Sequence, residues 1–419
     1  MMLPRGFRDL EPDEYELMEV IREAFKKTCN LYGFKIMEPS TLESIETLEA
    51  KSGPSIKDEI YFFRDKGGRN VGLRFDLTIG LTRYVCSRRD LPLPVKLASF
   101  ADVWRYDEPQ RARYRWFYQW DAEIYGPKNY LADAEIIIFT TDVFHETGLK
   151  DIEVKIGDRR MVQGLIKNIT GLDNDKTIEL MRALDKVDRK RIEDLIDEYK
   201  KKGISEEDIV KVLQLGKIEG DPNYLLNKFD ERVFTDEIIA LSDILRSNNI
   251  SFTVSAKIVR GLDYYTSIVF EVFYRKDRQI GAIAGGGRYD ILTSIFGRPE
   301  IGATGVAGGV ERHLIALRKE DIRPERGERV YIAYMKGYDK KAFEIARKIR
   351  NEGIPAMMNL VNRSLSKQLE EADKRGVPFV VMILPKEVEE GYVVLKDMNR
   401  REERKIKIDE IVRYVRKTI

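Results

Sequence analysis

The spacing of apolar and polar residues changes several times along the chain, and each change predicts a new element. Apolar residues recur at helical spacing from Leu17 to Thr28, which predicts a long helix that ends near Gly33. The segment FKIMEP that follows is typical of a strand closed by a proline. Residues 59–78 predict a hairpin with a turn at 66–69, and residues 79–90 predict another helix.

Residues 102–126 predict two strands joined by a basic, aromatic loop. Arginines near the loop and acids at the far end suit a ligand with phosphates at one end and an amine or ring nitrogen at the other. A solvated amphipathic hairpin shows the same alternation, so the pattern alone leaves both interpretations open. The alternating positions are Val103, Arg105 and Asp107 on the first strand, Arg111, Arg113, Tyr114, Arg115 and Trp116 in and beside the loop, and Phe117, Gln119, Asp121 and Glu123 on the second strand.

The rest of the chain divides into three regions. Residues 132–158 predict a helix and a strand, and residues 159–233 are charged and helical, with turns at three glycines. A helix at 235–248 is followed by a tyrosine-rich stretch at 254–274, a glycine-rich strand end at 280–290 and a glycine-rich strand entering a helix at 301–317. After a charged linker at 319–329, strands and helices alternate, which predicts a small α/β domain.

Composition narrows the function classes. The 419 residues suffice for two or three domains, and 73 Lys and Arg against 71 Asp and Glu leave a net charge of +2. Nucleic acid would therefore have to be bound through local basic patches. Cys29 and Cys86 lie in apolar helical patterns, so buried thiols are expected, and neither His145 nor His313 has a metal-ligand partner at useful spacing. No long apolar run or signal peptide is present, which favours a cytoplasmic protein.

Several of these stretches carry a family resemblance. Residues 102–126 resemble motif 2 of the class II aminoacyl-tRNA synthetases, the helix, strand and proline up to Pro39 resemble motif 1, and residues 301–317 resemble motif 3. Within that class, VRGLDYYT at 259–266 is close to the element that distinguishes histidyl-tRNA synthetases, and the similarity to that family covers nearly the whole chain. The family pattern continues after Arg312 with leucine, whereas this chain has His313, and we expect that departure to affect packing only.

The resemblance implies an α/β (α+β) architecture. It predicts a class II catalytic domain with an antiparallel sheet over residues 1–322, interrupted by a helical insertion at about 159–233, and an anticodon-binding domain at 329–419. In the family such an insertion touches the acceptor arm of the tRNA. The mixed-sign charge run in this one also suits a solvated helix surface, and solvated surface likewise remains an alternative for each predicted tRNA contact.

The activity implied is that of a histidine–tRNA ligase. Such an enzyme uses ATP, accompanied by Mg²⁺, to convert L-histidine to histidyl-adenylate, and then transfers the histidyl group to the 3′ end of tRNA(His). The resemblance also implies a homodimer and no dedicated protein metal site. No membrane partner is expected.

Residue roles follow from the resemblance position by position. Arg105 would meet the α-phosphate, Arg312 the γ-phosphate, and Arg260 the attacking carboxylate, where other class II enzymes rely on a metal ion. The predicted catalytic pair is Arg105 and Arg260. The predicted ATP set is Arg105, Asp107 and Phe117 around adenine and the α-phosphate, with Arg113 and Arg312 on the distal phosphates. The predicted histidine set is Asp76, Leu77 through its backbone, Thr78 and Gln119 around the α-amino group, Glu123, Tyr264 and Tyr265 around the imidazole, and Arg105 and Arg260. Gln110 and Arg111 are predicted to reach the tRNA acceptor end.

Two details belong with these roles. The segment LRFDLT predicts that Asp76 and Thr78 share one face of a strand, and the basic segment at 400–419 suits phosphate contacts.

Two other functions compete: a non-catalytic, histidine-binding regulatory subunit of ATP phosphoribosyltransferase, and a different class II synthetase. Retention of Arg105, Arg260, Arg312 and the region after residue 330 argues against the first, and VRGLDYYT argues against the second.

Overall fold

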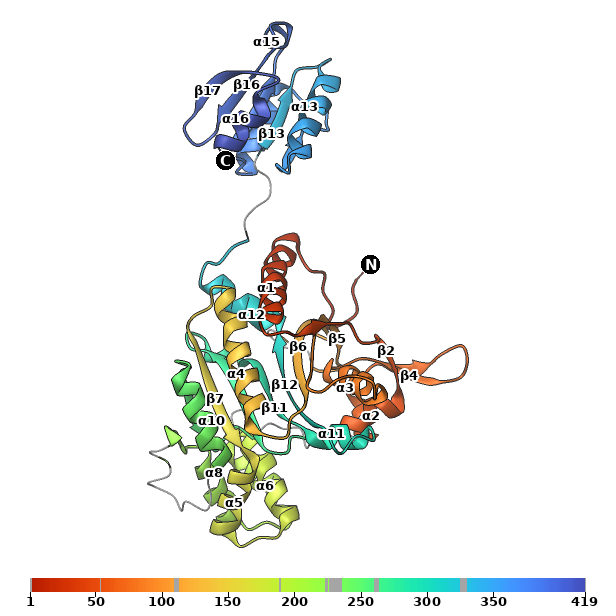
Figure 1. Ribbon diagram of the computed structural model, residues 1–419, viewed down its shortest axis with the longest axis vertical. Helices are drawn as coiled ribbons and strands as arrows, with labels where there is room; N and C mark the ends of the chain where they lie inside the picture. Colours follow the sequence, from red (N-terminus) through yellow and green to blue (C-terminus); the bar gives the residue numbers. More distant parts are fainter. Residues whose placement is uncertain are drawn as a thin grey trace. The chain divides into compact units, whose positions relative to one another are not determined.

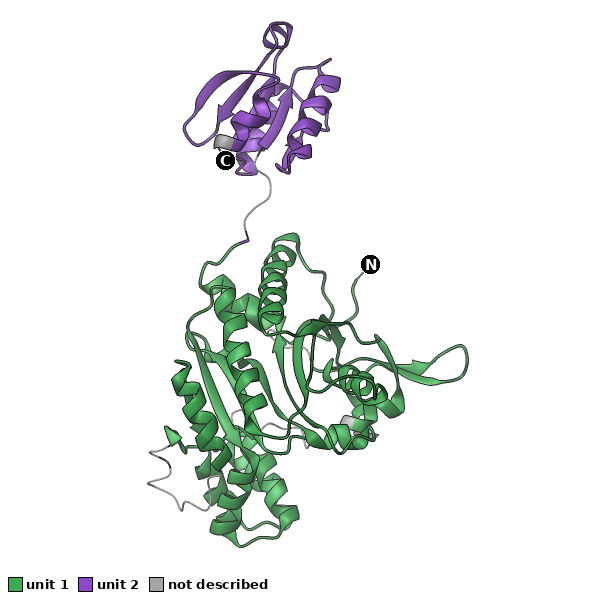
Figure 2. Cartoon of the chain, in the orientation of Figure 1, with its two compact units in different colours: residues 1–323 green, residues 324–419 purple. Residues whose placement is uncertain are grey.

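The computed structural model divides into two compact units, residues 1–323 and 324–419 (Figure 2). It describes residues 2–52, 54–108, 113–187, 190–222, 225, 236–259, 264–324 and 330–418. Three predicted site residues, Gln110, Arg111 and Arg260, lie outside these ranges.

Unit 1 is built on a nine-stranded sheet that is antiparallel apart from the β1–β5 and β7–β9 pairs. This arrangement confirms the predicted fold class. In spatial order the strands are β1 (Lys35–Ile36), β5 (Val95–Trp104), β6 (Trp116–Gly126), β12 (Gly302–Gly309), β11 (Ala282–Arg288), β10 (Ile268–Tyr274), β7 (Ile152–Asp158), β9 (Phe252–Ser255) and β8 (Glu219–Gly220).

The two faces of strand β6 have different neighbours. Trp120, Ala122 and Ile124 belong to the core that contains α1 (Pro12–Leu31), α4 (Tyr130–Glu146) and α12 (Val310–Lys319), which lie together in Figure 1. Because successive strand residues point to opposite faces, the intervening side chains face the other way. Tyr125 accordingly packs with residues of α3 (Thr78–Ser87) and α11 (Asp290–Ile295).

Glycines in β12 allow the central strands to pack closely. A Cβ atom on Gly308 would lie 2.0 Å from the ring of Trp120, closer than any real contact. The indole is fully buried, and its ring centroid lies 5.4 Å from that of Phe25 in α1. The glycine-rich sequence of β12 therefore makes room for the buried tryptophan of β6.

A smaller sheet precedes the large one in the chain. It has three antiparallel strands in the order β2 (Leu42–Ser44), β4 (Asn70–Leu73) and β3 (Phe62–Arg64), with α2 (Ile45–Ser52) and the 3-10 helix η1 (Pro54–Asp58) between β2 and β3. The predicted hairpin is present, but the prediction that Asp76 and Thr78 share a strand face is wrong. The strand ends at Leu73 and Thr78 opens α3, because the Asp76 carboxylate accepts a hydrogen bond from the Ile79 amide (3.3 Å) and so favours a helix start.

The prediction for the first strand of the 102–126 hairpin is also corrected. That strand begins seven residues earlier, at Val95, and ends at Trp104, so Arg105 and Asp107 lie beyond its end. The Arg105 amide still donates to the Arg115 carbonyl (3.0 Å), which keeps the start of the loop paired with the base of β6.

The described residues between β7 and β8 form four helices. They are α5 (Arg159–Thr170), α6 (Asn174–Lys186), α7 (Ile192–Lys200) and α8 (Glu206–Leu215). Side chains of Asp158, Asp173 and Ser205 accept from backbone amides at the starts of α5, α6 and α8, which explains where these helices begin. Helix α10 (Asp236–Ser247) then leads back to the sheet, and the 3-10 helix η3 (Arg278–Ile280) precedes β11.

Unit 2 is a five-stranded mixed sheet with helices. The strand order is β14 (Ala356–Met358), β13 (Val330–Tyr334), β15 (Phe379–Ile383), β16 (Tyr392–Asp397) and β17 (Glu402–Lys407). The helices are α13 (Asp339–Asn351), α14 (Leu365–Lys374), α15 (Pro385–Glu389) and α16 (Ile411–Thr418). The sequence pattern did not predict β17, because Ile406 is its one buried residue and no apolar alternation marks it.

Within the described ranges, no helix is both long and apolar enough to cross a membrane.

Candidate active site

A cavity of about 210 Å³ lies in unit 1 where β6, β11 and β12 meet the start of α12. Six predicted site residues line it together: Arg105, Asp107, Arg113, Phe117, Gln119 and Arg312. Tyr114, Glu271, Glu311 and small residues of β11 and β12 complete the wall. The predicted ATP set is therefore gathered around a single cavity, although its members come from stretches two hundred residues apart in the chain.

The fold holds the two predicted phosphate-binding arginines in place. Arg105 donates from Nε to the Phe75 carbonyl (2.8 Å) and from Nη2 to Gln119 Oε1 (3.2 Å), and its guanidinium carbon lies 5.1 Å from the Phe117 ring centroid. Arg312 donates from Nη1 to the Ala282 carbonyl (2.7 Å). These bonds place two cations at fixed positions in the cavity wall, which suits an anionic ligand.

Asp107 and Arg113 form an ion pair at the cavity. Arg113 Nε donates to Asp107 Oδ2 (3.0 Å), and both side chains are partly exposed. Arg115 supports the same turn by donating from Nε to the Asp107 carbonyl (3.0 Å). The assignments of Asp107 to adenine and Arg113 to distal phosphates remain predictions.

A buried acidic cluster adjoins this cavity through Gln119. Asp121 is fully buried and accepts from Gln119 Nε2 (2.8 Å) and from the Thr78 hydroxyl (3.3 Å). Glu123 is 1% exposed and accepts from the Tyr289 hydroxyl (2.5 Å). Burial, followed by the negative charge of Asp121, holds the pKa of Glu123 well above its ordinary value. With Asp76 also contributing negative charge there, the cluster suits a cationic or hydrogen-bond-donating ligand group.

Gly305 makes the space that Glu123 occupies. The two residues are paired across the β12–β6 ladder, and a Cβ atom on Gly305 would lie 1.4 Å from Glu123 Oε2. A side chain at this position would therefore displace the carboxylate. The glycine run thus shapes the acidic cluster as well as the packing of β6.

The two tyrosines predicted to bind histidine are connected to the acidic cluster through a third tyrosine, Tyr289. Tyr264 and Tyr265 are buried, and their rings are stacked at 4.5 Å between centroids. Tyr264 lies 6.0 Å from Tyr289 in an edge-on contact, and Tyr289 bonds Glu123. Leu77, predicted to contribute through its backbone, is buried in a small apolar cluster with Val103.

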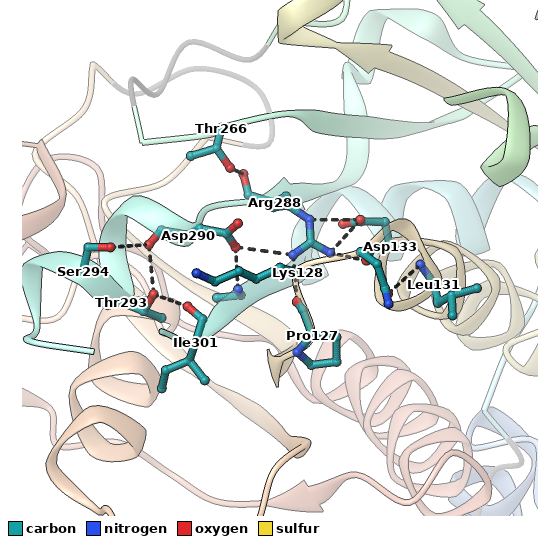
Figure 3. Close-up of polar contacts among 12 residues, drawn as sticks. Pro127, Lys128, Leu131, Asp133, Thr266, Arg288, Asp290, Thr293, Ser294 and Ile301 are labelled. Carbon is teal, nitrogen blue, oxygen red and sulfur yellow. Dashed lines mark hydrogen bonds and ion pairs between the residues drawn. The ribbon is translucent and has the colours of Figure 1, made fainter. Parts of the chain in front are cut away.

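Figure 3 shows the hydrogen bonds of Arg288, a buried arginine that directly precedes Tyr289 in the chain. Arg288 ends β11 directly before Tyr289 and donates from Nε and Nη2 to Asp133 Oδ2 (3.1 and 2.7 Å) and from Nη2 to the Asn129 carbonyl (2.6 Å). Its own carbonyl accepts from the Thr266 amide (2.8 Å). The end of β11, the start of α4 and the residue after Tyr265 are joined in this way.

Sequence reasoning gave no site role to Tyr289 or Arg288, and it named Asp121 only among the acids at the far end of the predicted hairpin. The available signals were the alternation of Asp121 with Gln119 and Glu123, and the residues RY directly after a run of three glycines. Neither signal shows that residues of β6, α3 and β11 converge, because that depends on the order of strands in the sheet.

Two side chains at the start of α12 have displaced pKa values. Burial raises the pKa of Glu311, which lines the cavity and accepts from the Tyr118 amide (3.0 Å), to about 7. Burial lowers the pKa of His313 to about 3. His313, the departure from the family pattern, is buried with its Nε2 2.9 Å from the Thr147 hydroxyl, and it is not one of the residues that line the cavity.

The fold has close counterparts among solved synthetases. The crystal structure of histidyl-tRNA synthetase from Nostoc sp. PCC 7120 superposes with a TM-score of 0.82 at 23% identity, covering 100% of this chain and 99% of that chain. A structure described as an ATP phosphoribosyltransferase regulatory subunit/histidyl-tRNA synthetase from Bacillus halodurans C gives a TM-score of 0.73 at 24% identity, covering 92% of this chain and 98% of that chain. These likenesses define the fold as that of an aminoacyl-tRNA synthetase.

Comparison with sequence relatives identifies the family within the aminoacyl-tRNA synthetases. Residues 6–312 match the family model for histidyl-tRNA synthetase, and residues 329–418 match the model for an anticodon-binding domain. The histidine–tRNA ligase of Pyrococcus furiosus is 36% identical over 99% of this chain and 98% of its own length. That of Thermococcus kodakarensis is 35% identical over 98% of this chain and 97% of its own length. The chain belongs to the histidyl-tRNA synthetase family.

Proposed function

We propose that the protein is a histidine–tRNA ligase, which activates L-histidine with ATP and transfers the histidyl group to tRNA(His). One observation supports this most strongly: a cavity with Arg105 and Arg312 in its wall adjoins a buried cluster of Asp121 and Glu123, and Gln119 belongs to both. Cations beside acids at this spacing suit a substrate pair of a polyphosphate and an amino acid with a basic side chain.

In the first step, the carboxylate oxygen of histidine attacks the α-phosphorus of ATP, and pyrophosphate leaves. Negative charge builds up at the α-phosphate, and Arg105, already fixed by Phe75 and Gln119, would stabilise it. Arg312 would hold the γ-phosphate. By family resemblance Arg260 would neutralise the attacking carboxylate.

In the second step, a ribose hydroxyl at the tRNA 3′ end attacks the carbonyl carbon of the adenylate, and AMP leaves. By family resemblance, Gln110 and Arg111 would reach the acceptor end, and the region at 329–419 would bind the anticodon. Residues 1–322 would form the catalytic domain, with 159–233 as its insertion. A protein with these substrates would act in the cytoplasm.

The two substrates would use neighbouring parts of the site. Phe117 would stack on adenine beside Asp107, with Arg113 on the distal phosphates. Mg²⁺ would accompany ATP, and the carboxylates of Glu271 and Glu311 in the cavity wall are suitable oxygen ligands for an ion held mainly by phosphates. The proposed histidine contacts are Asp76, Leu77, Thr78 and Gln119 at the α-amino group, Glu123, Tyr264 and Tyr265 at the imidazole, and Arg105 and Arg260 at the carboxylate.

A homodimer is part of the proposal. Apolar side chains on short strands of unit 1 are exposed in the single chain: Ile36 in β1 (48%), Leu42 in β2 (44%), and Phe62 and Phe63 in β3 (49% and 47%). Burial of such side chains against a second copy would stabilise association. Light scattering during size-exclusion chromatography measures the molar mass, and a mass near 48.7 kDa would contradict the dimer.

ATP–pyrophosphate exchange with each amino acid in turn tests the proposed activity, followed by charging of tRNA(His) with labelled histidine. Exchange that depends on histidine, together with charging, supports the ligase. Histidine binding without any exchange would favour a regulatory subunit of ATP phosphoribosyltransferase. Exchange with another amino acid would favour a different class II synthetase.

A further inference from the structure

Asp121 is bonded to two residues, Gln119 and Thr78, that are proposed to bind the amino acid. It lies on β6 between Gln119 and Glu123, on the same face of the strand, and its side chain is fully buried. A buried carboxylate requires hydrogen-bond donors, and two of its donors come from different elements: Gln119 of β6 and Thr78 of α3.

The first donor fixes the orientation of an amide. Gln119 Nε2 donates to Asp121 Oδ1 (2.8 Å), and Gln119 Oε1 accepts from Arg105 Nη2 (3.2 Å). A carboxylate can only accept, and a guanidinium can only donate, so both neighbours impose the same amide orientation. The amide oxygen of Gln119, which lines the cavity, is therefore presented as an acceptor.

The second donor orients a hydroxyl. The oxygen of Thr78 lies 3.3 Å from Asp121 Oδ2, and Glu123 is also within hydrogen-bonding reach of the same hydroxyl. Whichever of the two carboxyl groups accepts, Thr78 uses its single O–H donor in that hydrogen bond. The lone pairs of its oxygen then remain available to accept a hydrogen bond.

We propose that Asp121 is a positioning residue that makes both Gln119 and Thr78 hydrogen-bond acceptors for the α-ammonium group of the bound amino acid. The inference rests on the proposed function and adds a residue to it. A protonated amine offers three donors and no acceptor, so a pocket that faces it with donors would repel it. The negative charge of Asp121 adds attraction for the cation at longer range.

The isosteric variant Asp121→Asn tests this mechanism. An asparagine amide can also donate, so Gln119 and Thr78 lose a neighbour that only accepts. Arg105 alone then fixes the Gln119 amide, and Thr78 can turn its hydroxyl donor toward the ammonium. Calorimetry of the full-length protein would compare L-histidine with 3-(imidazol-4-yl)propionate, which lacks only the α-amino group. We expect histidine to bind about 10- to 100-fold more weakly to the variant, the scale for hydrogen bonds to a charged group. The affinity for the deamino analogue should change less than about threefold.

Asp277→Asn is the matched control, because it removes another buried carboxylate, one that pairs with Lys319. It should leave both ligands unaffected. If Asp121→Asn does not fold, the smaller Asp121→Ser is measured in the same way.

Equal weakening of both ligands, or no weakening, would overturn the proposed role of Asp121. The proposed function fails differently: the unmodified protein would then show no preference for histidine and no exchange with it. The pattern of KM values gives a second readout. The KM for histidine should rise in Asp121→Asn while that for ATP stays unchanged, whereas a general disturbance of the fold would alter both.

Discussion

Arg105 illustrates how individual side chains of the site are held before any substrate arrives. Its guanidinium is bonded to a backbone carbonyl and to Gln119, and it lies near the Phe117 ring. A cation fixed in this way can stabilise charge in a transition state without the cost of reorganising. Gln119 connects Arg105 to the buried carboxylate of Asp121, so the site combines opposite charges over a short distance.

Replacing Arg105 should affect adenylation strongly. We expect Arg105→Ala to lower the rate of histidine-dependent ATP–pyrophosphate exchange by about 10²-fold or more, the scale for losing one preorganised donor. Arg105→Lys keeps the charge but loses the planar fork, so an intermediate loss is expected. Exchange at the normal rate in Arg105→Ala would exclude the proposed contact with the α-phosphate.

Glu311 should make stability depend on pH. Its folded pKa of about 7 lies above the ordinary value of 4.5, so between these values the folded state binds a proton that the unfolded state has lost. Stability therefore falls as pH rises from about 4.5 to about 7, by up to about 3 kcal/mol. Glu311→Gln lacks this titration, so Tm of the variant relative to the parent should be higher at pH 8 than at pH 5. A difference in Tm that is the same at both values, measured by calorimetry, would contradict the shift.

At the scale of elements, strand β12 determines which side chains the neighbouring strand β6 can accommodate. Its glycines accommodate Trp120 on one face and the Glu123 carboxylate on the other. The neighbouring strand β11 ends at Arg288, which bonds Asp133, and the next residue, Tyr289, bonds Glu123. Glycine generally weakens a strand because it has no side chain to pack. In β12 the glycines are needed, because side chains of β6 approach the β12 backbone closely on both faces of the sheet.

Gly305→Ala should disrupt the acidic cluster. Its added carbon would lie 1.4 Å from Glu123 Oε2, so the carboxylate must move away from Tyr289. We expect a rise in KM for histidine of about 10-fold or more and a loss of stability of about 1–3 kcal/mol from overpacking. Gly164→Ala in α5 is the control, because an added carbon meets nothing within 4 Å there and the residue does not line the cavity. Similar kinetics for the two variants would show that Glu123 does not need this space.

At the scale of the whole molecule, the chain divides its tasks between two units. The described residues that line the cavity and form the acidic cluster all belong to unit 1. Unit 2 has its own buried core around Val330, Ile345 and Val393 and matches an anticodon-binding domain. The chemistry of activation should therefore be separable from the selection of tRNA.

Truncation after residue 323 tests this separation. We expect the shortened protein to keep histidine-dependent exchange within about threefold of the full chain, since no described lining residue is removed. Charging of tRNA(His) should fall by at least about 10-fold through loss of tRNA affinity. Exchange is the internal control for folding of unit 1, and undiminished charging would show that unit 2 is not needed for tRNA recognition.

The sequence by itself determined the family, the main helices, the glycine-rich strands and the six predicted site residues that line the cavity. These follow from local patterns: helical spacing predicts α1, α4 and α10, and the motifs predict Arg105, Phe117 and Arg312. Local patterns did not predict the correct element where a side-chain hydrogen bond or a partner strand determined the backbone conformation. Asp76 favours a helix start over a strand, and β17 is a strand held by its partner β16 with little apolar signal of its own.

Only the tertiary structure showed which distant residues meet. Asp121, Tyr289 and Arg288 have ordinary local surroundings, and their positions in the site depend on the order β6, β12, β11 in the sheet. The orientation of a side-chain amide likewise depends on its neighbours. Gln119 presents its oxygen as an acceptor because its nitrogen donates to Asp121 and Arg105 donates to its oxygen. Such relations join residues far apart in the chain, so no local pattern in the sequence contains them.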